Sequence, residues 1–294
     1  MKRSKRIDSD SGYDVLMYII ATFALIITLY PFLYIIAVSF SGSQAVYRGE
    51  VFLWPVNPTL AGYRQVLSQK GIWTAYQNTL FYTIVGTAFN IVATTIAAFP
   101  LSRKSFSGRR YCNFFIAFTM YFSGGLIPTY LLITNLGFYN SRWVMIIPSL
   151  LSTFNVMVCR SAFSAIPDEV FESAQMDGAS DWKTFSRIAI HLITPTLAVL
   201  VLYYAVSRWN NFMTPLLYIS KSELMPMQVL LRRVLIQSSS ELLDAGSAGS
   251  DDRAAVSVQI RYVTIVVATL PILVSYPLLQ RYFVKGVMLG AVKG

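Results

Sequence analysis

Six long stretches of the chain carry no charged side chain, and this pattern sets the expected fold. A helix needs roughly 20 mainly apolar residues to cross the hydrocarbon core of a bilayer, so each stretch can hold one crossing. The pattern therefore predicts an all-α membrane protein with six transmembrane helices. Asp, Glu, Lys and Arg are absent from residues 15–47, 71–102, 111–141, 143–159, 188–207 and 262–280.

The spans are expected to form one transmembrane domain over residues 15–283. A polar N-terminal segment and a short basic tail flank this domain, at residues 1–14 and 284–294. Two external loops are expected at residues 40–75 and 209–259, which are polar or rich in interfacial aromatic residues. The spans themselves are placed at about 15–39, 76–101, 111–135, 142–164, 188–208 and 260–283.

The third predicted span contains helix-breaking residues near its middle, Ser123-Gly124-Gly125 followed by Pro128. Backbone groups freed at such a break must be satisfied by neighbouring helices or by a wet cavity. A kink that lines a pore is one interpretation. Close packing between helices is the other, and it is the commoner use of small residues in membranes.

Composition and charge distribution place the chain in a membrane and orient it there. The chain is 55% hydrophobic and only 13% charged, with a mean hydropathy of +0.53, whereas a soluble protein of this size needs a larger charged surface. The net charge is +10, and many of the basic residues behind it lie beside the spans on one side of the membrane. This predicts that both termini are cytoplasmic and argues against a nucleic-acid partner. The basic residues concerned are Lys2, Arg3, Lys5, Arg6, Arg103, Lys104, Arg109, Arg110, Lys285 and Lys293.

The segment 165–187 differs from an ordinary cytoplasmic loop, which is short and basic. It holds five acidic residues against Lys183 and Arg187, and it contains apolar residues although it is too short and too polar to cross the membrane. Pro167, the acids that follow it, and Gly178 predict a short helix between them. An acidic amphipathic helix needs a surface to bury against, and an anionic lipid leaflet would repel it. The remaining surfaces are the ends of the protein's own helices and a groove in a partner protein.

Residues 172–195 carry a spaced motif, namely Glu172-Ser173-Ala174, Asp177-Gly178-Ala179, Phe185, Ile188 and Pro195. The motif resembles the EAA loop of type I ABC importer permeases, a family with a MetI-like fold. In that family the loop forms a coupling helix seated in a groove of the ATPase subunit. Ser173 replaces the usual second alanine, and His191 stands where proline is usual, which leaves the start of the fifth span open. The ATPase-coupling residues implied by the resemblance are Phe171, Glu172, Ser173, Ala174, Asp177, Gly178, Ala179 and Phe185.

The resemblance extends over nearly the whole chain. Residues 78–103, which end in AAFPLSR, are similar to the second span of the carbohydrate-uptake branch. Residues 122–128, FSGGLIP, look like the sub-branch that includes importers of alginate and pectin-derived uronides. The C-terminal tail is similar to that of the smaller maltose-importer permease, which reaches toward the ATPase dimer interface. The contact residues implied there are Gly290, Val292, Lys293 and Gly294.

This resemblance implies a permease subunit of an ATP-driven importer of oligosaccharides, including acidic ones, in the bacterial inner membrane. The implied partners are a second, related permease that forms a heterodimer, two ATPase subunits, an external solute-binding protein, the oligosaccharide and membrane lipid. The sequence contains no Gly-x-x-x-x-Gly-Lys-Ser/Thr phosphate loop. ATP and Mg²⁺ are therefore expected on the partner ATPase, and no cofactor is expected in this chain.

Other functional classes find little support in the sequence. His191 is the only histidine, and it has no Cys or carboxylate at ligand spacing, so neither a metal site nor a catalytic histidine is predicted. Cys112 and Cys159 are expected in a reducing location without a disulfide. No acidic residue lies inside a predicted span, which counts against a proton-coupled secondary transporter and leaves an enzyme without a catalytic set. A self-sufficient channel or secondary transporter for a small polar solute remains the alternative.

A translocation path would need polar side chains that face it. Arg208 and Arg261, at the outer ends of the fifth and sixth spans, can attract a carboxylated sugar or can anchor their helices at the interface. Hydroxyl and amide side chains inside the spans can form hydrogen bonds with sugar hydroxyls. The candidates for the path are Asn78, Asn90, Thr94, Thr95, Ser123, Asn155, Tyr203, Tyr204 and Arg208.

Overall fold

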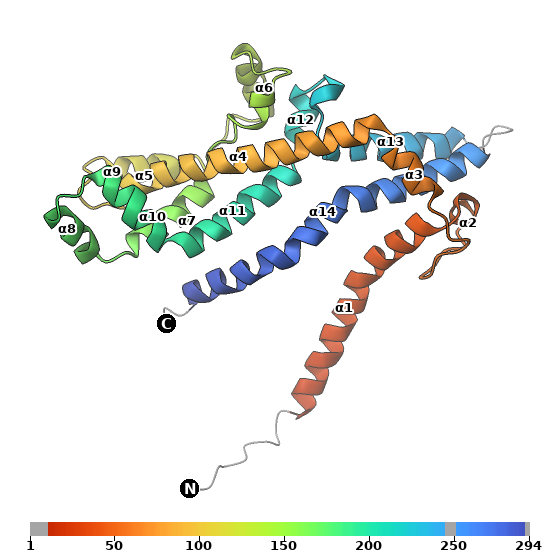
Figure 1. The fold of residues 1–294 in the computed structure, drawn as a ribbon, viewed down its shortest axis with the longest axis horizontal. Helices are drawn as coiled ribbons and strands as arrows, with labels where there is room; N and C mark the ends of the chain where they lie inside the picture. The colour runs from red at the N-terminus through yellow and green to blue at the C-terminus, as the bar shows by residue number, and fades with distance from the viewer. Residues whose placement is uncertain (1–10, 245–250, 292–294) are drawn as a thin grey trace, which may run out of the picture. The chain divides into compact units, whose positions relative to one another are not determined.

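The computed structural model describes residues 11–244 and 251–291 of the chain. Every regular element among them is a helix, which confirms the predicted all-α class (Figure 1). The chain forms two compact units, residues 1–69 with 231–270 and residues 70–230 with 271–294. Three residues of the expected ATPase-contact tail, Val292, Lys293 and Gly294, lie outside the described residues.

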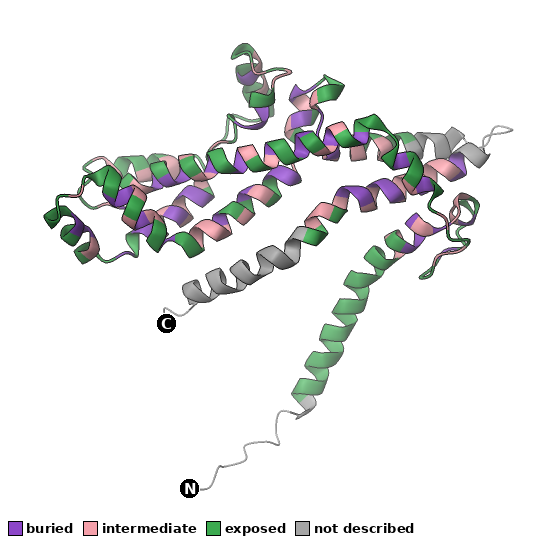
Figure 2. Cartoon of the chain, viewed as in Figure 1, coloured by how far each residue is buried: buried purple, intermediate pink, exposed green. Residues whose placement is uncertain are grey.

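The first unit combines the N-terminal helices with parts of two later helices. Gln259 of α14 donates from Nε2 to the Ser41 carbonyl at 2.8 Å, and a Cβ on Gly62 of α3 would lie only 3.1 Å from Val263. By contrast, α1 is exposed along most of its length, as expected of a helix that faces lipid or another subunit (Figure 2). The helices are α1 (Ser11–Phe40), α2 (Ser43–Tyr47), α3 (Ala61–Leu67), α13 (Met227–Asp244) and α14 (Asp251–Ala291).

The second unit is organised around α4, an unbroken helix of 33 residues that packs against α7 and α11 (Figure 1). Ala98, Val156, Cys159 and Leu200 are buried between these three helices. Its elements are α4 (Lys70–Ser102), α5 (Arg109–Phe118), α6 (Leu126–Asn135), η1 (Arg142–Met145), α7 (Thr153–Ser164), α8 (Asp168–Met176), α9 (Asp181–Thr184), η2 (Phe185–Ala189), α10 (Ile190–Leu192), α11 (Thr194–Trp209), α12 (Met213–Tyr218) and η3 (Ser222–Leu224).

Three helices in the described part of the chain are long and apolar enough to cross a membrane, namely Tyr13–Phe40, Lys70–Ser102 and Ala254–Val274. They correspond to the first, second and sixth predicted spans. A bent pair, Asp181–Leu192 with Thr194–Trp209, turns by 81° and raises the number to four if it is one span. The fifth predicted span thus contains a sharp bend near its start, at Ile193, two residues before Pro195.

The third predicted span, residues 111–135, is not one continuous helix in the structure. Residues 119–125 separate α5 from α6, and Gly125 has a φ of +83°, a backbone conformation that favours glycine. The break lies at the Ser123-Gly124-Gly125 sequence where a kink was expected.

A continuous helix over residues 142–164 is also absent. The 3₁₀ turn η1 ends at Met145 and α7 begins only at Thr153. The side chain of Ser152 accepts a hydrogen bond from the Asn155 backbone N–H and so starts α7 as its N-cap.

The two segments expected as external loops contain helices. α2 and α3 occupy part of residues 40–75, and α4 already begins at Lys70. α12, η3 and α13 occupy much of residues 209–259. Asn78 of α4 anchors this second segment by donating from Nδ2 to the Glu223 carbonyl at 2.7 Å.

Candidate coupling site

The predicted short helix in the segment 165–187 is present as α8, with the expected local signals at its ends. Pro167 stands at its N-cap, and Asp168 and Glu169 occupy its first turn, where acidic side chains favour the positive end of the helix dipole. Gly178 has a φ of +71°, which closes the helix C-terminus in the left-handed conformation. The Ala179 N–H donates to the Ala174 carbonyl at 2.9 Å across this turn.

One face of α8 is buried against the rest of the second unit. Phe171 and Ala174 on this face are 3% and 5% exposed. The Phe171 ring lies 6.2 Å from the ring of Phe99, near the end of α4, and Phe99 also contacts Phe163 at 5.4 Å and Phe185 at 5.1 Å. Phe99 is thus a shared contact of α4 with α7, α8 and η2.

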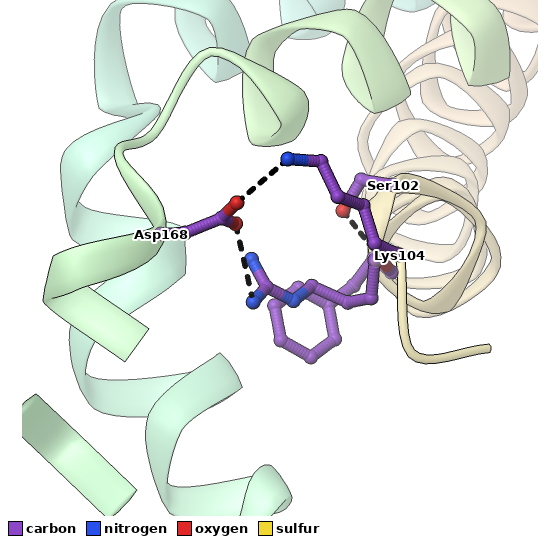
Figure 3. A network of polar contacts seen from close by, with 5 residues as sticks. Ser102, Lys104 and Asp168 are labelled. Atoms are coloured by element: carbon purple, nitrogen blue, oxygen red, sulfur yellow. Dashed lines mark hydrogen bonds and ion pairs between the residues drawn. The ribbon is translucent and has the colours of Figure 1, made fainter. Parts of the chain in front are cut away.

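Basic residues after α4 hold the first turn of α8 (Figure 3). Lys104 Nζ lies 2.9 Å from Asp168 Oδ2, and Arg103 Nη2 lies 3.7 Å from Asp168 Oδ1. The guanidinium carbon of Arg103 also stands 3.5 Å from the centre of the Phe171 ring. The hydrogen bond from Lys104 and the nearby positive charges hold the pKa of Asp168 below its ordinary value, so the carboxylate is ionised at neutral pH.

The opposite face of α8 carries acidic side chains without ion pairs to the described residues. Glu169, Glu172 and Asp177 are exposed and form no ion pair with any residue that the structure describes. Met176 lies between them with 89% of its surface exposed. Beside them is an open hollow of about 420 Å³, lined by Glu169, Val170, Ser173, Ala174, Asp177 and Ile188. The helix therefore presents an acidic surface with an apolar side chain at its centre.

Two of the candidate path residues form a buried polar cluster in the second unit. Asn90 of α4 accepts hydrogen bonds at Oδ1 from Arg208 Nε and Nη2, at 3.0 and 2.9 Å. Arg208 Nη2 also lies 3.2 Å from the carbonyl oxygen of Ile146, and Asn90 Nδ2 donates to the carbonyls of Ser149 and Leu150. Both side chains thus satisfy carbonyl groups in the non-helical stretch between η1 and α7.

The other path candidates divide by exposure. Thr94 and Tyr204 are buried, and their hydroxyl oxygens lie 2.7 Å apart between α4 and α11. Asn78, Thr95 and Asn155 are also buried, whereas Ser123 and Tyr203 are exposed. The structure therefore brings Asn90, Thr94, Tyr204 and Arg208 to the packed surfaces of α4 and α11 and leaves Ser123 apart from them on the α5–α6 connection.

Comparison with known proteins decides the family. The model of the binding-protein-dependent transport system inner membrane component matches residues 10–289, nearly the full length. The chain belongs to this permease family. It is therefore a multi-pass inner-membrane subunit of an ABC importer and not an enzyme, and ATP hydrolysis takes place on separate subunits. Membership excludes the alternative of a self-sufficient channel or secondary transporter.

Two proteins similar to this permease are named for polysaccharide transport or import. The polygalacturonan/rhamnogalacturonan transport system permease protein YtcP of Bacillus subtilis is 38% identical over 283 residues, which cover 96% of this chain and 98% of that protein. In the crystal structure of a bacterial ABC transporter involved in the import of the acidic polysaccharide alginate, one chain matches with a TM-score of 0.85 and 31% identity, over 96% of this chain and 100% of that chain.

A second solved structure shares only the fold. It is a bacterial alginate ABC transporter in complex with an alginate pentasaccharide-bound periplasmic protein. One of its chains matches this permease with a TM-score of 0.53 and 17% identity, over 94% of this chain and 99% of that chain.

Sequence reasoning about this permease missed two residues at the end of α4. Arg103 was assigned only to the basic flank of a span, and Phe99 only to a similar sequence block, yet both contact Phe171. The available signal was the opposite charge of two segments, since the Arg103-Lys104 pair is basic and residues 168–177 are acidic. Pairing the two segments still required the fold, because α5, α6 and α7 separate them along the chain.

Replacing Gly178 by alanine is expected to loosen the end of α8. No atom lies within 4 Å of the Cβ that this change adds, so its cost is the left-handed backbone conformation alone, about 1 kcal/mol. A loss of this size should raise the rate of proteolytic cleavage within residues 165–187 about fivefold in the purified permease. Gly178→Asn is the matched control, because asparagine tolerates this conformation, and equal cleavage rates for the two variants would contradict the explanation.

Proposed function

We propose that this permease is one of two related subunits of an importer for acidic oligosaccharides, and that α8 is the helix gripped by its ATPase subunits. Six spans, with both termini and α8 on the cytoplasmic side, fit the distribution of basic residues. In this arrangement Gly290, Val292, Lys293 and Gly294 form a second contact with the ATPase. An external solute-binding protein delivers the substrate, a role supported by the alginate transporter with its periplasmic protein.

The acidic class of substrate is supported by the relatives and by the sequence. One relative is a polygalacturonan/rhamnogalacturonan permease, and a solved relative takes part in alginate import. Both polysaccharides contain uronic acids, whose carboxylates need cationic or hydrogen-bonding partners along the path. Asn155, Ser123 and Tyr203 remain path candidates, together with Asn78, Asn90, Thr94, Tyr204 and Arg208.

The observation that carries the coupling role is the contrast between the two faces of α8. Its inner face is fixed by Phe171 and Ala174, while its outer face exposes three carboxylates and 89% of Met176. A large apolar side chain surrounded by unpaired acids on a surface outside the spans suits a groove with an apolar floor and a basic rim. An ATPase subunit that offers such a groove would move α8 as it closes on ATP.

The test is Glu172→Lys in the complex assembled with its second permease and its ATPases. Charge reversal at this exposed position should leave membrane insertion intact, because the side chain has no partner among the described residues. Like charges placed across a protein interface cost several kcal/mol, so co-purification of the ATPase and uptake of oligogalacturonide or alginate oligosaccharide into proteoliposomes should fall about tenfold or more.

This experiment has two control variants. Glu50→Lys reverses a charge on another exposed glutamate, which lies near Arg48 in the first unit, and should leave uptake unchanged. Glu172→Gln removes the charge without reversing it and should give an intermediate loss. Parental uptake by Glu172→Lys would rule out α8 as the helix that the ATPase grips.

A further inference from the structure

Arg103, directly after the C-terminal end of α4, contacts α8 in two different ways. Its guanidinium carbon lies 3.5 Å from the centre of the Phe171 ring, and its Nη2 lies 3.7 Å from Asp168 Oδ1. Only 22% of the Arg103 side chain is exposed. A planar guanidinium stacked on an aromatic face and paired with a carboxylate is held in one orientation, which an ammonium group does not require.

The neighbouring Lys104 makes a weaker connection despite its shorter distance. Its Nζ lies 2.9 Å from Asp168 Oδ2, but 80% of its side chain is exposed (Figure 3). An exposed pair of this kind is screened by water and salt and adds little to the position of a helix. Arg103 is therefore the basic residue that fixes the distance between α4 and α8.

α8 and α4 are connected by side-chain contacts and are not consecutive along the chain. Along the chain, α8 is joined to α7 on one side and to α9 on the other, whereas α4 ends far before it. The side-chain contacts from the end of α4 to α8 include the Phe99 ring, Arg103 and Lys104. A displacement of α8 can reach α4 directly through these contacts.

The helix at the other end of this contact is suited to carry a displacement through the membrane. α4 runs without a break for 33 residues. At a rise of 1.5 Å per residue, it is long enough to cross a membrane. Along its course, Asn90 is bonded to Arg208 and Thr94 to Tyr204, so α4 and α11 are linked at two polar positions. A shift at Arg103 is thus passed to two spans.

We propose that Arg103 is the positioning residue that transmits movement of α8 to α4 during the transport cycle, through its stacking on Phe171 and its pair with Asp168. This role rests on the proposed function of α8 as the helix gripped by the ATPase. It concerns the step after that grip, since Arg103 lies on the inner side of α8 and Glu172 on the outer side.

The decisive measurement is the amount of oligosaccharide transported per ATP hydrolysed by the complete complex in proteoliposomes. Arg103→Met keeps the length and apolar stem of the side chain and removes the cation. It should lower this ratio about fivefold, the size expected when a cation–π contact of this kind is lost, while the ATPase still co-purifies at the parental level. Arg103→Lys keeps the positive charge but not the planar guanidinium, so it should recover only part of the ratio.

Two further variants show whether Arg103 acts through the Phe171 ring. Phe171→Leu keeps an apolar side chain but removes the ring, and combining it with Arg103→Met should lower the ratio no further than either change alone. Arg110→Met removes an exposed cation from the start of α5 and should leave the ratio at the parental value.

The outcomes separate the role of Arg103 from that of α8. A parental ratio in Arg103→Met, or two losses that multiply in the double variant, would overturn transmission through Arg103. If Glu172→Lys lowers ATPase co-purification while Arg103→Met transports normally, only the role of Arg103 fails. If Glu172→Lys also has no effect, the proposed grip on α8 fails first.

Discussion

Asn90→Leu is expected to destabilise the packing of α4, α7 and α11 by about 3 kcal/mol or more. The Asn90 side chain is fully buried and makes four hydrogen bonds, two from Arg208 to its Oδ1 and two from its Nδ2 to the carbonyls of Ser149 and Leu150. Leucine has a similar volume but leaves the carbonyls and the Arg208 guanidinium without these partners. In a membrane interior no water replaces them, and each unsatisfied buried group costs about 1–3 kcal/mol.

The measurement is the thermal unfolding midpoint of the purified complex in detergent, which should fall by about 5 °C or more. Gln77→Leu is the matched control, because Gln77 is an exposed polar residue on the same helix, and its midpoint should stay near that of the parent. A normal midpoint for Asn90→Leu with impaired transport would instead place Asn90 on the sugar path, as the sequence alone suggested.

The candidate coupling helix could be predicted from sequence because its signals are local. Proline and two acids begin it, a glycine with positive φ ends it, and the alternation of Phe171 and Ala174 with charged residues identifies its buried face. Each of these signals depends on neighbours within one or two turns. The first and last residues of α8 could therefore be predicted from residues 167–178 alone.

The interruption between η1 and α7 could not be predicted in the same way. Residues 142–164 are apolar enough to cross a membrane, but Pro148 lies among them and disfavours a continuous helix. The chain leaves the helical path at Ile146, and the freed carbonyls are satisfied by Asn90 and Arg208, which are 118 residues apart in sequence. Pro148 is thus a local signal for the break, whereas the two distant side chains that satisfy its carbonyls could not be identified from the segment itself.

The helix α13 was missed for a different reason. Its polar and charged residues suggested a loop, although Met227, Leu230, Val234 and Leu235 recur at the spacing of one helical face. The spacing of these hydrophobic residues would have identified the helix, whereas the overall polarity of the segment suggested a loop. Composition thus located the long spans but was a poor guide to the helices between them.

Phe99→Ala is expected to lower transport about as strongly as Glu172→Lys, although Phe99 lies on α4. The Phe99 ring contacts Phe163, Phe171 and Phe185. Its removal therefore takes away one contact of α4 with each of α7, α8 and η2. Truncating a buried phenylalanine to alanine costs about 3–5 kcal/mol, and a half-buried ring about half as much. Because the Phe99 ring lies against Phe171, part of this cost falls on the contact between α4 and α8, and uptake should fall about tenfold.

Uptake into proteoliposomes and proteolysis within residues 165–187 should change together in Phe99→Ala, with cleavage becoming faster as uptake falls. Phe89→Ala is the matched control, since Phe89 lies on the same helix with 47% of its surface exposed and is away from α8. The thermal midpoint should fall less than in Asn90→Leu, because the buried hydrogen bonds between α4 and α11 remain. Full uptake in Phe99→Ala would mean that movement of α8 reaches the spans through α7 and α9 rather than through α4.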